Sequence, residues 1–156
     1  MNANYLLRIR VALTIFIFGL LLSGATAFPL ETEVTWLAKQ TAAYPDSALN
    51  HWFVTVRDAL VTTNGHYSFL AYGTDWLGFA HIVLAIAFLG PWRDPIKNIW
   101  MIEFGMVACV LVLPFAFIAG GVRGIPLGWR LVDCSFGILG IIPLLYCWSQ
   151  IKRMKQ

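Results

Sequence analysis

Four long apolar stretches dominate the pattern of hydrophobic and polar positions along the chain. They cover about residues 11–28, 73–90, 99–120 and 131–148. An α-helix rises about 1.5 Å per residue, so each stretch approaches the roughly 30 Å hydrocarbon thickness of a bilayer. The turn at residues 91–98 is too short for anything but an antiparallel connection. We therefore expect an all-α protein, with an antiparallel four-helix transmembrane bundle as its single domain.

A more polar insertion, about residues 31–66, separates the first two apolar stretches. Within it, apolar side chains recur at helical spacing and form one stripe, made by Leu49, Trp52, Phe53, Val56 and Leu60. A shorter helix over about residues 32–43 precedes this one. We expect the two helices to form an amphipathic lid that lies on the membrane or over the bundle.

Local signals predict where helices start, stop or bend. Asp46 or Ser47 can cap the start of the amphipathic helix, and Asn64–Gly65 is expected to end it. Proline inside a helix removes a backbone donor. We therefore expect Pro114 to kink the third apolar stretch or to free a carbonyl for a neighbour to satisfy, and Pro143 to interrupt the fourth.

The first apolar stretch has two interpretations. A basic flank, an apolar run and an Ala25–Ala27 end are also what a cleavable signal peptide contains. Against cleavage, Gly19, Ser23 and Ala27 recur every four residues, and such a ridge suits close packing of helices in lipid. We expect a retained helix. Small side chains also form faces on the third and fourth stretches, at Gly105, Ala108, Cys109, Cys134, Gly137 and Gly140.

Composition supports a membrane protein. The 156 residues are 59% apolar and 12% charged, whereas a soluble domain carries about 25% charge. The net charge is only +3 and the basic residues form no stripe, so nucleic-acid binding has no support. The three cysteines, Cys109, Cys134 and Cys147, lie inside apolar stretches without metal-ligand spacing. We expect them to act as small buried hydrophobic residues.

The basic residues predict an orientation. Seven fall on one side of the predicted bundle: Arg8, Arg10, Arg93, Lys97, Lys152, Arg153 and Lys155. Four fall on the other side: Lys39, Arg57, Arg123 and Arg130. The positive-inside rule then puts both termini and the 91–98 turn in the cytoplasm. The lid and the loop at residues 121–130 face outward, into the periplasm if the protein is a bacterial inner-membrane protein.

Four charged residues fall near the outer end of the predicted bundle. Asp75 begins the second stretch, Arg130 and Asp133 begin the fourth, and Arg123 lies in the loop before it. Charges within a membrane are costly, and arginine pairs with carboxylates through two hydrogen bonds. The four residues either form an ion-pair network that locks the helices or hold the polar head of a ligand.

Two further ionisable residues lie deeper. Glu103 is about one turn inside the cytoplasmic end of the third stretch, and a structural charge clamp with Arg93 is expected, with a proton relay as the alternative. His81 lies among apolar neighbours and must form a hydrogen bond, bind a metal or tetrapyrrole, or titrate. It shares a helix face with Thr74 and Gly78, and Gly78 would let another helix or a flat ligand approach.

No second histidine matches the depth of His81, which disfavours a haem held by two histidines of one chain. A tetrapyrrole bound by His81 alone, a haem shared between copies, or a neutral histidine bonded across helices remain open. The sequence has no P-loop, zinc-protease or nucleophile-elbow motif, and no inverted repeat. We expect no catalytic residues, no metal site and no required cofactor.

Three segments, residues 23–37, 69–105 and 122–144, resemble an uncharacterised family of small four-helix bacterial inner-membrane proteins. The resemblance implies the fold and the membrane, and it brings no activity and no site residues.

Two functions fit these observations. In the first, the chain is a non-catalytic accessory or self-associating subunit of a membrane assembly, whose partners are the lipid bilayer and another membrane protein or a second copy. In the second, it binds, and transforms or transports, a small amphipathic ligand such as a quinone, lipid or tetrapyrrole at an outer-leaflet site under the lid. That site would comprise Asp75, His81, Arg123, Arg130 and Asp133, with Trp52 and Phe53 of the lid over the apolar part of the ligand.

Overall fold

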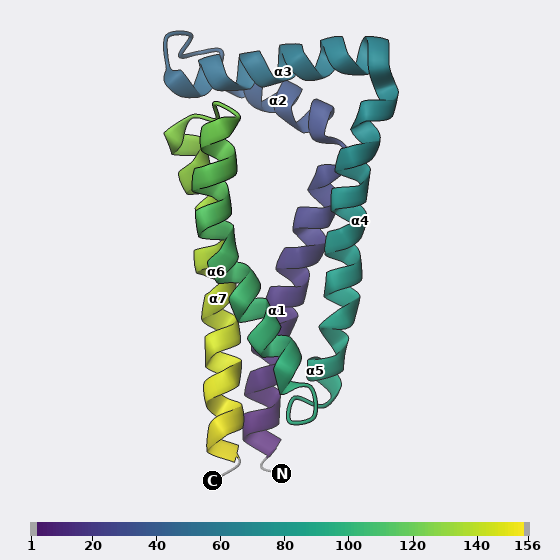
Figure 1. Cartoon of the computed structure of the whole chain (residues 1–156), viewed down its shortest axis with the longest axis vertical. Helices are drawn as coiled ribbons and strands as arrows, with labels where there is room; N and C mark the ends of the chain where they lie inside the picture. The colour runs from purple at the N-terminus through teal and green to yellow at the C-terminus, as the bar shows by residue number, and fades with distance from the viewer. Residues whose placement is uncertain (1–2, 155–156) are drawn as a thin grey trace. The chain divides into compact units, whose positions relative to one another are not determined.

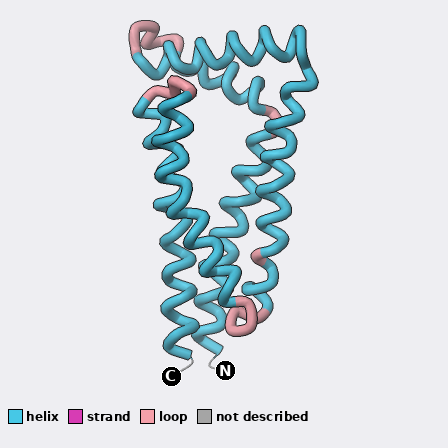
Figure 2. The backbone as a smooth tube through the Cα atoms, in the orientation of Figure 1, coloured by secondary structure: helices cyan, strands magenta, loops and turns pink. Residues whose placement is uncertain are grey.

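The computed structural model describes residues 3–154, and every regular element in this part of the chain is helical (Figures 1 and 2). In chain order the elements are α1 (Ala3–Ala27), α2 (Leu30–Thr41), α3 (Ala48–Tyr67), the 3-10 helix η1 (Ser68–Ala71), α4 (Tyr72–Ala87), α5 (Leu89–Arg93), α6 (Ile99–Val122) and α7 (Leu127–Met154). Lys155, one of the seven basic residues assigned to the cytoplasmic side, lies outside the described residues.

Four helical stretches of the described chain are long and apolar enough to cross a membrane. They are Asn4–Ala27, Ala48–Arg93, Ile99–Val122 and Leu127–Met154. The second of them joins α3, η1, α4 and α5, and the other three fall within single helices. Length and composition thus indicate a membrane protein, as the apolar pattern predicts.

The chain divides into two compact units. The terminal unit joins the chain up to Gly19 with the chain from Leu84 onward, and the central unit is Leu20–Val83. The division falls inside the continuous helices α1 and α4.

In the terminal unit, α6 and α7 lie side by side (Figure 1). Gly105 on α6 lies against Leu144 on α7, and Gly120 lies against Arg130. Residue numbers rise along one helix as they fall along the other, so the two helices run antiparallel. The first half of α1 joins the same core, whose fully buried side chains include Ile9, Leu13, Phe88, Ile102, Leu144, Cys147 and Ile151.

Glycine allows this close packing. A Cβ atom on Gly137 would collide with the carbonyl oxygen of Cys109, and one on Gly105 would come within 2.7 Å of the Phe88 ring. Real Cβ contacts are essentially never this short. The small-residue faces predicted on the third and fourth stretches are therefore confirmed at these positions, whereas Ala108 is exposed.

In the central unit, the end of α1 crosses α4 at a pair of glycines. A Cβ atom on Gly24 would lie 2.8 Å from the carbonyl oxygen of Gly78, and one on Gly78 would lie 2.8 Å from that of Gly24. Another helix therefore approaches Gly78, one of the two alternatives expected there. The small-residue ridge predicted at Gly19, Ser23 and Ala27 makes no close helix contact at its first member. Gly19 is exposed, and a methyl group there would meet no atom within 4 Å.

Helices α2 and α3 pack against each other and are joined by hydrogen bonds at both ends. Thr41 Oγ1 donates to Asn50 Oδ1 at 3.1 Å near the connecting turn, and Asn64 Nδ2 donates to Glu31 Oε2 at 2.6 Å at the far end. Phe53 of the predicted apolar stripe is buried, whereas Leu49 is exposed. Ser47 caps α3 as predicted, since its Oγ accepts a hydrogen bond from the backbone N–H of Asn50.

Several predicted boundaries were wrong. Helix α3 continues through Asn64–Gly65 to Tyr67, because the Asn64 side chain bonds to Glu31 across the helix pair and Gly65 does not adopt a positive φ. Helix α7 continues through Pro143, which was expected to interrupt it. Helix α6 also continues through Pro114, and a kink or a freed carbonyl at that proline stays a prediction. The predicted second stretch divides into α4 and α5.

The terminal helices are longer than their apolar stretches. Helix α1 begins at Ala3 instead of about residue 11, and α7 spans Leu127–Met154 instead of about 131–148. Hydropathy falls at charged side chains, but the helical backbone does not end there. The connection between α6 and α7 is therefore only residues 123–126, with Gly124 at φ 68° supplying the turn.

We expect Gly137→Ala to lower the free energy of unfolding by about 1–3 kcal/mol, because the added methyl group pushes α7 away from the Cys109 backbone. Gly128→Ala is the matched control on the same helix, where nothing lies within 4 Å, and it should be neutral or stabilising by up to about 1 kcal/mol. Unfolding in mild detergent, followed by circular dichroism, measures both. Equal stability of the two variants would contradict the close contact.

Candidate functional site

His81 lies on the inward face of α4 in the central unit. This face also carries Thr74 and Gly78, and the His81 Cβ lies beside the Gly24–Gly78 crossing. His81 Nδ1 is 2.8 Å from the backbone oxygen of Leu77. A carbonyl oxygen can only accept, so this hydrogen bond has the proton on Nδ1. The recorded hydrogen bond thus stays within α4 instead of crossing to another helix.

Arg130 is held by the backbone near the start of α7 in the terminal unit. Its Nε donates to the carbonyl oxygen of Ile125 at 2.6 Å, and its methylene groups lie on Gly120. Arg123 is exposed and Asp133 is half-buried. Arg130 and Asp133 form no salt bridge, since Arg57–Asp58 is the only one among residues 3–154.

The five tentative ligand residues are therefore distributed over both units. Asp75 and His81 belong to the central unit, and Arg123, Arg130 and Asp133 belong to the terminal unit. Asp75 is half-buried near the start of α4. A cluster of Asp75 with the two arginines and Asp133 stays a prediction.

Glu103 has a different partner from the one expected. Its Oε1 accepts a hydrogen bond from Trp148 Nε1 at 3.1 Å, and Lys152 Nζ lies 5.0 Å from the centre of the Trp148 rings. Arg93, the expected partner in a charge clamp, is exposed and forms no salt bridge within the described chain. The indole thus joins the carboxylate and a cation through a hydrogen bond and a cation–π contact.

A second tryptophan in the terminal unit has the same surroundings. The Arg10 guanidinium carbon lies 4.9 Å from the centre of the Trp92 rings, and Arg10 Nε donates to the Trp92 carbonyl oxygen at 3.2 Å. Trp92 Nε1 in turn donates to Thr14 Oγ1 at 3.1 Å. Sequence reasoning missed both tryptophan–cation pairs, although the i, i+4 spacing of Trp148 and Lys152 indicates one of them.

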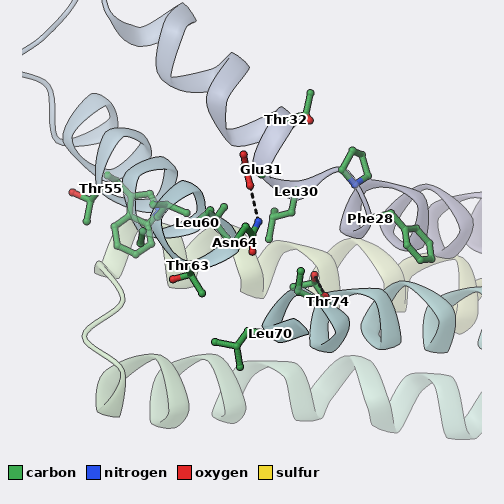
Figure 3. Close-up of a pocket in the computed structure, with 15 residues that line it drawn as sticks. Phe28, Leu30, Glu31, Thr32, Thr55, Leu60, Thr63, Asn64, Leu70 and Thr74 are labelled. Atoms are coloured by element: carbon green, nitrogen blue, oxygen red, sulfur yellow. Dashed lines mark hydrogen bonds between the residues drawn. The ribbon is translucent and has the colours of Figure 1, made fainter. Parts of the chain in front are cut away.

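The central unit contains an open cavity of about 630 Å³ (Figure 3). Its walls come from residues 28–32, from one face of α3, from Leu70 and Ala71 of η1, and from Thr74 of α4. The α3 face comprises Trp52, Thr55, Val56, Ala59, Leu60, Thr63 and Asn64. The cavity is thus lined by three members of the predicted apolar stripe and by none of the five tentative ligand residues.

Sequence reasoning missed the polar pair in the lining of this cavity, Glu31 and Asn64. Glu31 and Asn64 are 33 positions apart, and their hydrogen bond depends on the antiparallel packing of α2 and α3. The apolar stripe was the available signal, because its members Trp52, Val56 and Leu60 are half-buried and line the cavity. Nothing local in the sequence pairs Glu31 with that stripe.

Neither the metal-ligand residue types, the cysteines nor the comparisons with known proteins indicate an activity. Within residues 3–154, no group of three or more His, Cys, Asp or Glu side chains could hold a metal ion. Cys109, Cys134 and Cys147 are free and buried, and their burial confirms the prediction. No protein-family model, curated protein or solved structure matches the chain.

We expect Arg130→Lys to lower the stability by about 1 kcal/mol, because lysine keeps the positive charge but has no Nε–H to bond the Ile125 oxygen. Arg123→Lys is the matched control, since Arg123 is exposed nearby, and it should change the stability by less than about 0.5 kcal/mol. Chemical denaturation in detergent measures the difference. Full stability of Arg130→Lys would show that only the charge of Arg130 matters.

Proposed function

We propose that the chain is a non-catalytic integral protein of a bacterial inner membrane that associates with a larger membrane assembly or with its own copies. In this proposal, α1, α4 with α5, α6 and α7 form an antiparallel four-helix transmembrane bundle. Helices α2 and α3 form an amphipathic lid outside the membrane. The excess of lysine and arginine beside the chain ends and in the 91–98 turn supports cytoplasmic termini.

The local bonding of the polar side chains supports a non-catalytic role. His81 bonds to Leu77 of its own helix, Arg130 to the carbonyl oxygen of Ile125, and Glu103 to the Trp148 indole. General acid–base catalysis needs an acid or base within hydrogen-bond reach of a reacting group, usually oriented by another side chain. These three contacts instead hold side chains against the backbone or an aromatic ring, which is a structural use of the same residues.

The exposed face of α1 carries the proposal of association. Val11, Ile15, Phe18 and Leu22 follow one another at helical spacing, and each is more than half exposed. Gly19 lies within this face with no atom within 4 Å. A glycine inside a helix costs about 1 kcal/mol relative to alanine. Glycine in such a face allows the backbone of another helix to approach closely, and that packing offsets the cost.

The native mass of the full chain, extracted in mild detergent, tests this proposal. We expect a mass above the 17.5 kDa of one chain, as a homo-oligomer or with a co-purifying membrane protein. Gly19→Leu should return the protein to the mass of one chain, because the leucine side chain would occupy the space at Gly19 into which the other helix packs. Gly73→Leu is the control, since Gly73 is equally open but lies in the first turn of α4.

A wild-type protein that is a single chain with no associated protein would overturn the association. A Gly19→Leu protein that keeps the larger mass would place the association on another surface.

A second candidate function has its own observation. The cavity beside α3 has the volume of a small-molecule site and mostly apolar walls that include the hydrogen-bonded pair Glu31 and Asn64. We propose on this basis that the central unit binds a small amphipathic ligand. This site is a separate candidate from the predicted cluster of Asp75, His81, Arg123, Arg130 and Asp133, since those residues do not line the cavity.

A further inference from the structure

One face of α3 forms a wall of the cavity in the central unit. The lining residues of α3 run from Trp52 to Asn64 on one helix face, and a rise of about 1.5 Å per residue makes this wall roughly 18 Å long. Its volume of about 630 Å³ lies within the usual range for ligand pockets. A wall of this length suits an extended molecule with one hydrocarbon chain.

Two threonine hydroxyl groups in the cavity lining already have hydrogen-bond partners. Thr55 Oγ1 donates to the carbonyl oxygen of His51 at 2.7 Å, and Thr74 Oγ1 donates to that of Ala71 at 2.7 Å. Both hydroxyl groups thus bond to backbone carbonyl oxygens, that of Thr55 within α3 and that of Thr74 to the last residue of η1. Hydrocarbon along this wall would be removed from water.

The lining is polar and negatively charged where the α3 wall ends, at Asn64. Glu31 is the only charged residue among those that line it. Asn64 Nδ2 donates to Glu31 Oε2 at 2.6 Å (Figure 3). Glu31 Oε1 and Asn64 Oδ1 accept no hydrogen bond from the described residues, so both remain available as acceptors. The hydroxyl of Thr63, next in the wall, can rotate to donate or accept.

This end selects the charge of a ligand head. Two acceptors and one negative charge favour a head group that donates several hydrogen bonds and is positively charged. An ammonium group has three donors and one positive charge, whereas a hydroxyl has one donor and no charge. A carboxylate or phosphate head would meet the Glu31 charge with no lysine or arginine in the lining to offset the repulsion.

We propose that this cavity binds a single-chain amphiphile with a primary ammonium head, and that the head donates to Glu31 Oε1 and Asn64 Oδ1 beside the Glu31–Asn64 hydrogen bond, with the hydrocarbon along α3. The inference rests on the second candidate function and adds the chemical class of its ligand. Glu31 supplies the charge that determines specificity, and Asn64 positions the Glu31 carboxylate.

Calorimetric titration of the purified full chain in a neutral detergent tests the assignment. The probes are octylammonium, octanol and octanoate at pH 7, with heats corrected for empty micelles. We expect one octylammonium per chain, bound about tenfold or more tighter than octanol, because the charge-assisted hydrogen bonds are worth at least about 1.4 kcal/mol. Octanoate should bind more weakly than octanol.

Two carboxylate variants isolate the charge. Glu31→Gln keeps the size of the side chain, and it should reduce the affinity for octylammonium to that for octanol while leaving octanol binding unchanged. Glu33→Gln is the matched control, because Glu33 is in the same first turn of α2 but does not line the cavity. It should leave the affinities for all three probes unchanged.

Leu60→Trp, which fills the cavity, should abolish the binding of every probe. Circular dichroism verifies that the variant keeps its helices, and Ala59→Leu serves as a smaller filling substitution if it does not.

The outcomes separate the two claims. If the wild type binds octanol or octanoate as tightly as octylammonium, or if Glu31→Gln loses no affinity, the ammonium assignment is overturned and the cavity remains a ligand site. If no probe binds to the wild type, or if both filling variants bind as the wild type does, the second candidate function fails as well.

Discussion

A helix that crosses hydrocarbon has no water to satisfy its polar groups, so each group needs a partner on the same helix or on a helix in close contact. Both solutions occur here. Thr14 Oγ1 donates to the Arg10 carbonyl oxygen one turn earlier, and His81 Nδ1 donates to that of Leu77. Between helices, Trp148 Nε1 donates to Glu103 Oε1, and Cys147 Sγ donates to the carbonyl oxygen of Ile9. Helices also approach closely where Gly24 meets Gly78 and Gly137 meets the Cys109 carbonyl. Lipid tails are as apolar as the side chains, so this close van der Waals packing, more than burial from water, holds such helices together.

At one end of the terminal unit, charged side chains contact tryptophan side chains where an ion pair was expected. Each of Trp92 and Trp148 has a cation over its ring and an indole N–H donated to an oxygen, which is Thr14 Oγ1 in one case and Glu103 Oε1 in the other. Tryptophan is suited to a membrane interface because a large apolar ring carries a single donor. The acidic and basic residues there thus support the architecture. The cavity that could hold a ligand lies instead in the central unit, where α3, residues 28–32, η1 and Thr74 line it.

Periodicity and stretch length predicted the helices well and their ends poorly. The apolar stretches correctly indicated membrane-spanning lengths, and the small side chains on the third and fourth stretches correctly indicated contact at Gly105 and Gly137. Helix ends were missed because hydropathy reports side chains, while α7 extends past Arg130 and Lys152 through its backbone hydrogen bonds. The Glu31–Asn64 pair was missed for another reason. It connects distant positions, and only the packing of α2 on α3 brings the two side chains together.

The most direct test of the central claim is the accessibility of the two ends of α6 from opposite sides of the membrane. Single cysteines replace the exposed Lys97 and Arg123, which flank Ile99–Val122, in a chain whose three native cysteines are buried. A membrane-impermeant maleimide is then added to intact bacterial spheroplasts. We predict that the Arg123→Cys protein is labelled at once and that the Lys97→Cys protein is labelled only after the membrane is opened. Labelling of both from the same side would contradict a membrane-crossing α6 and the bundle that depends on it.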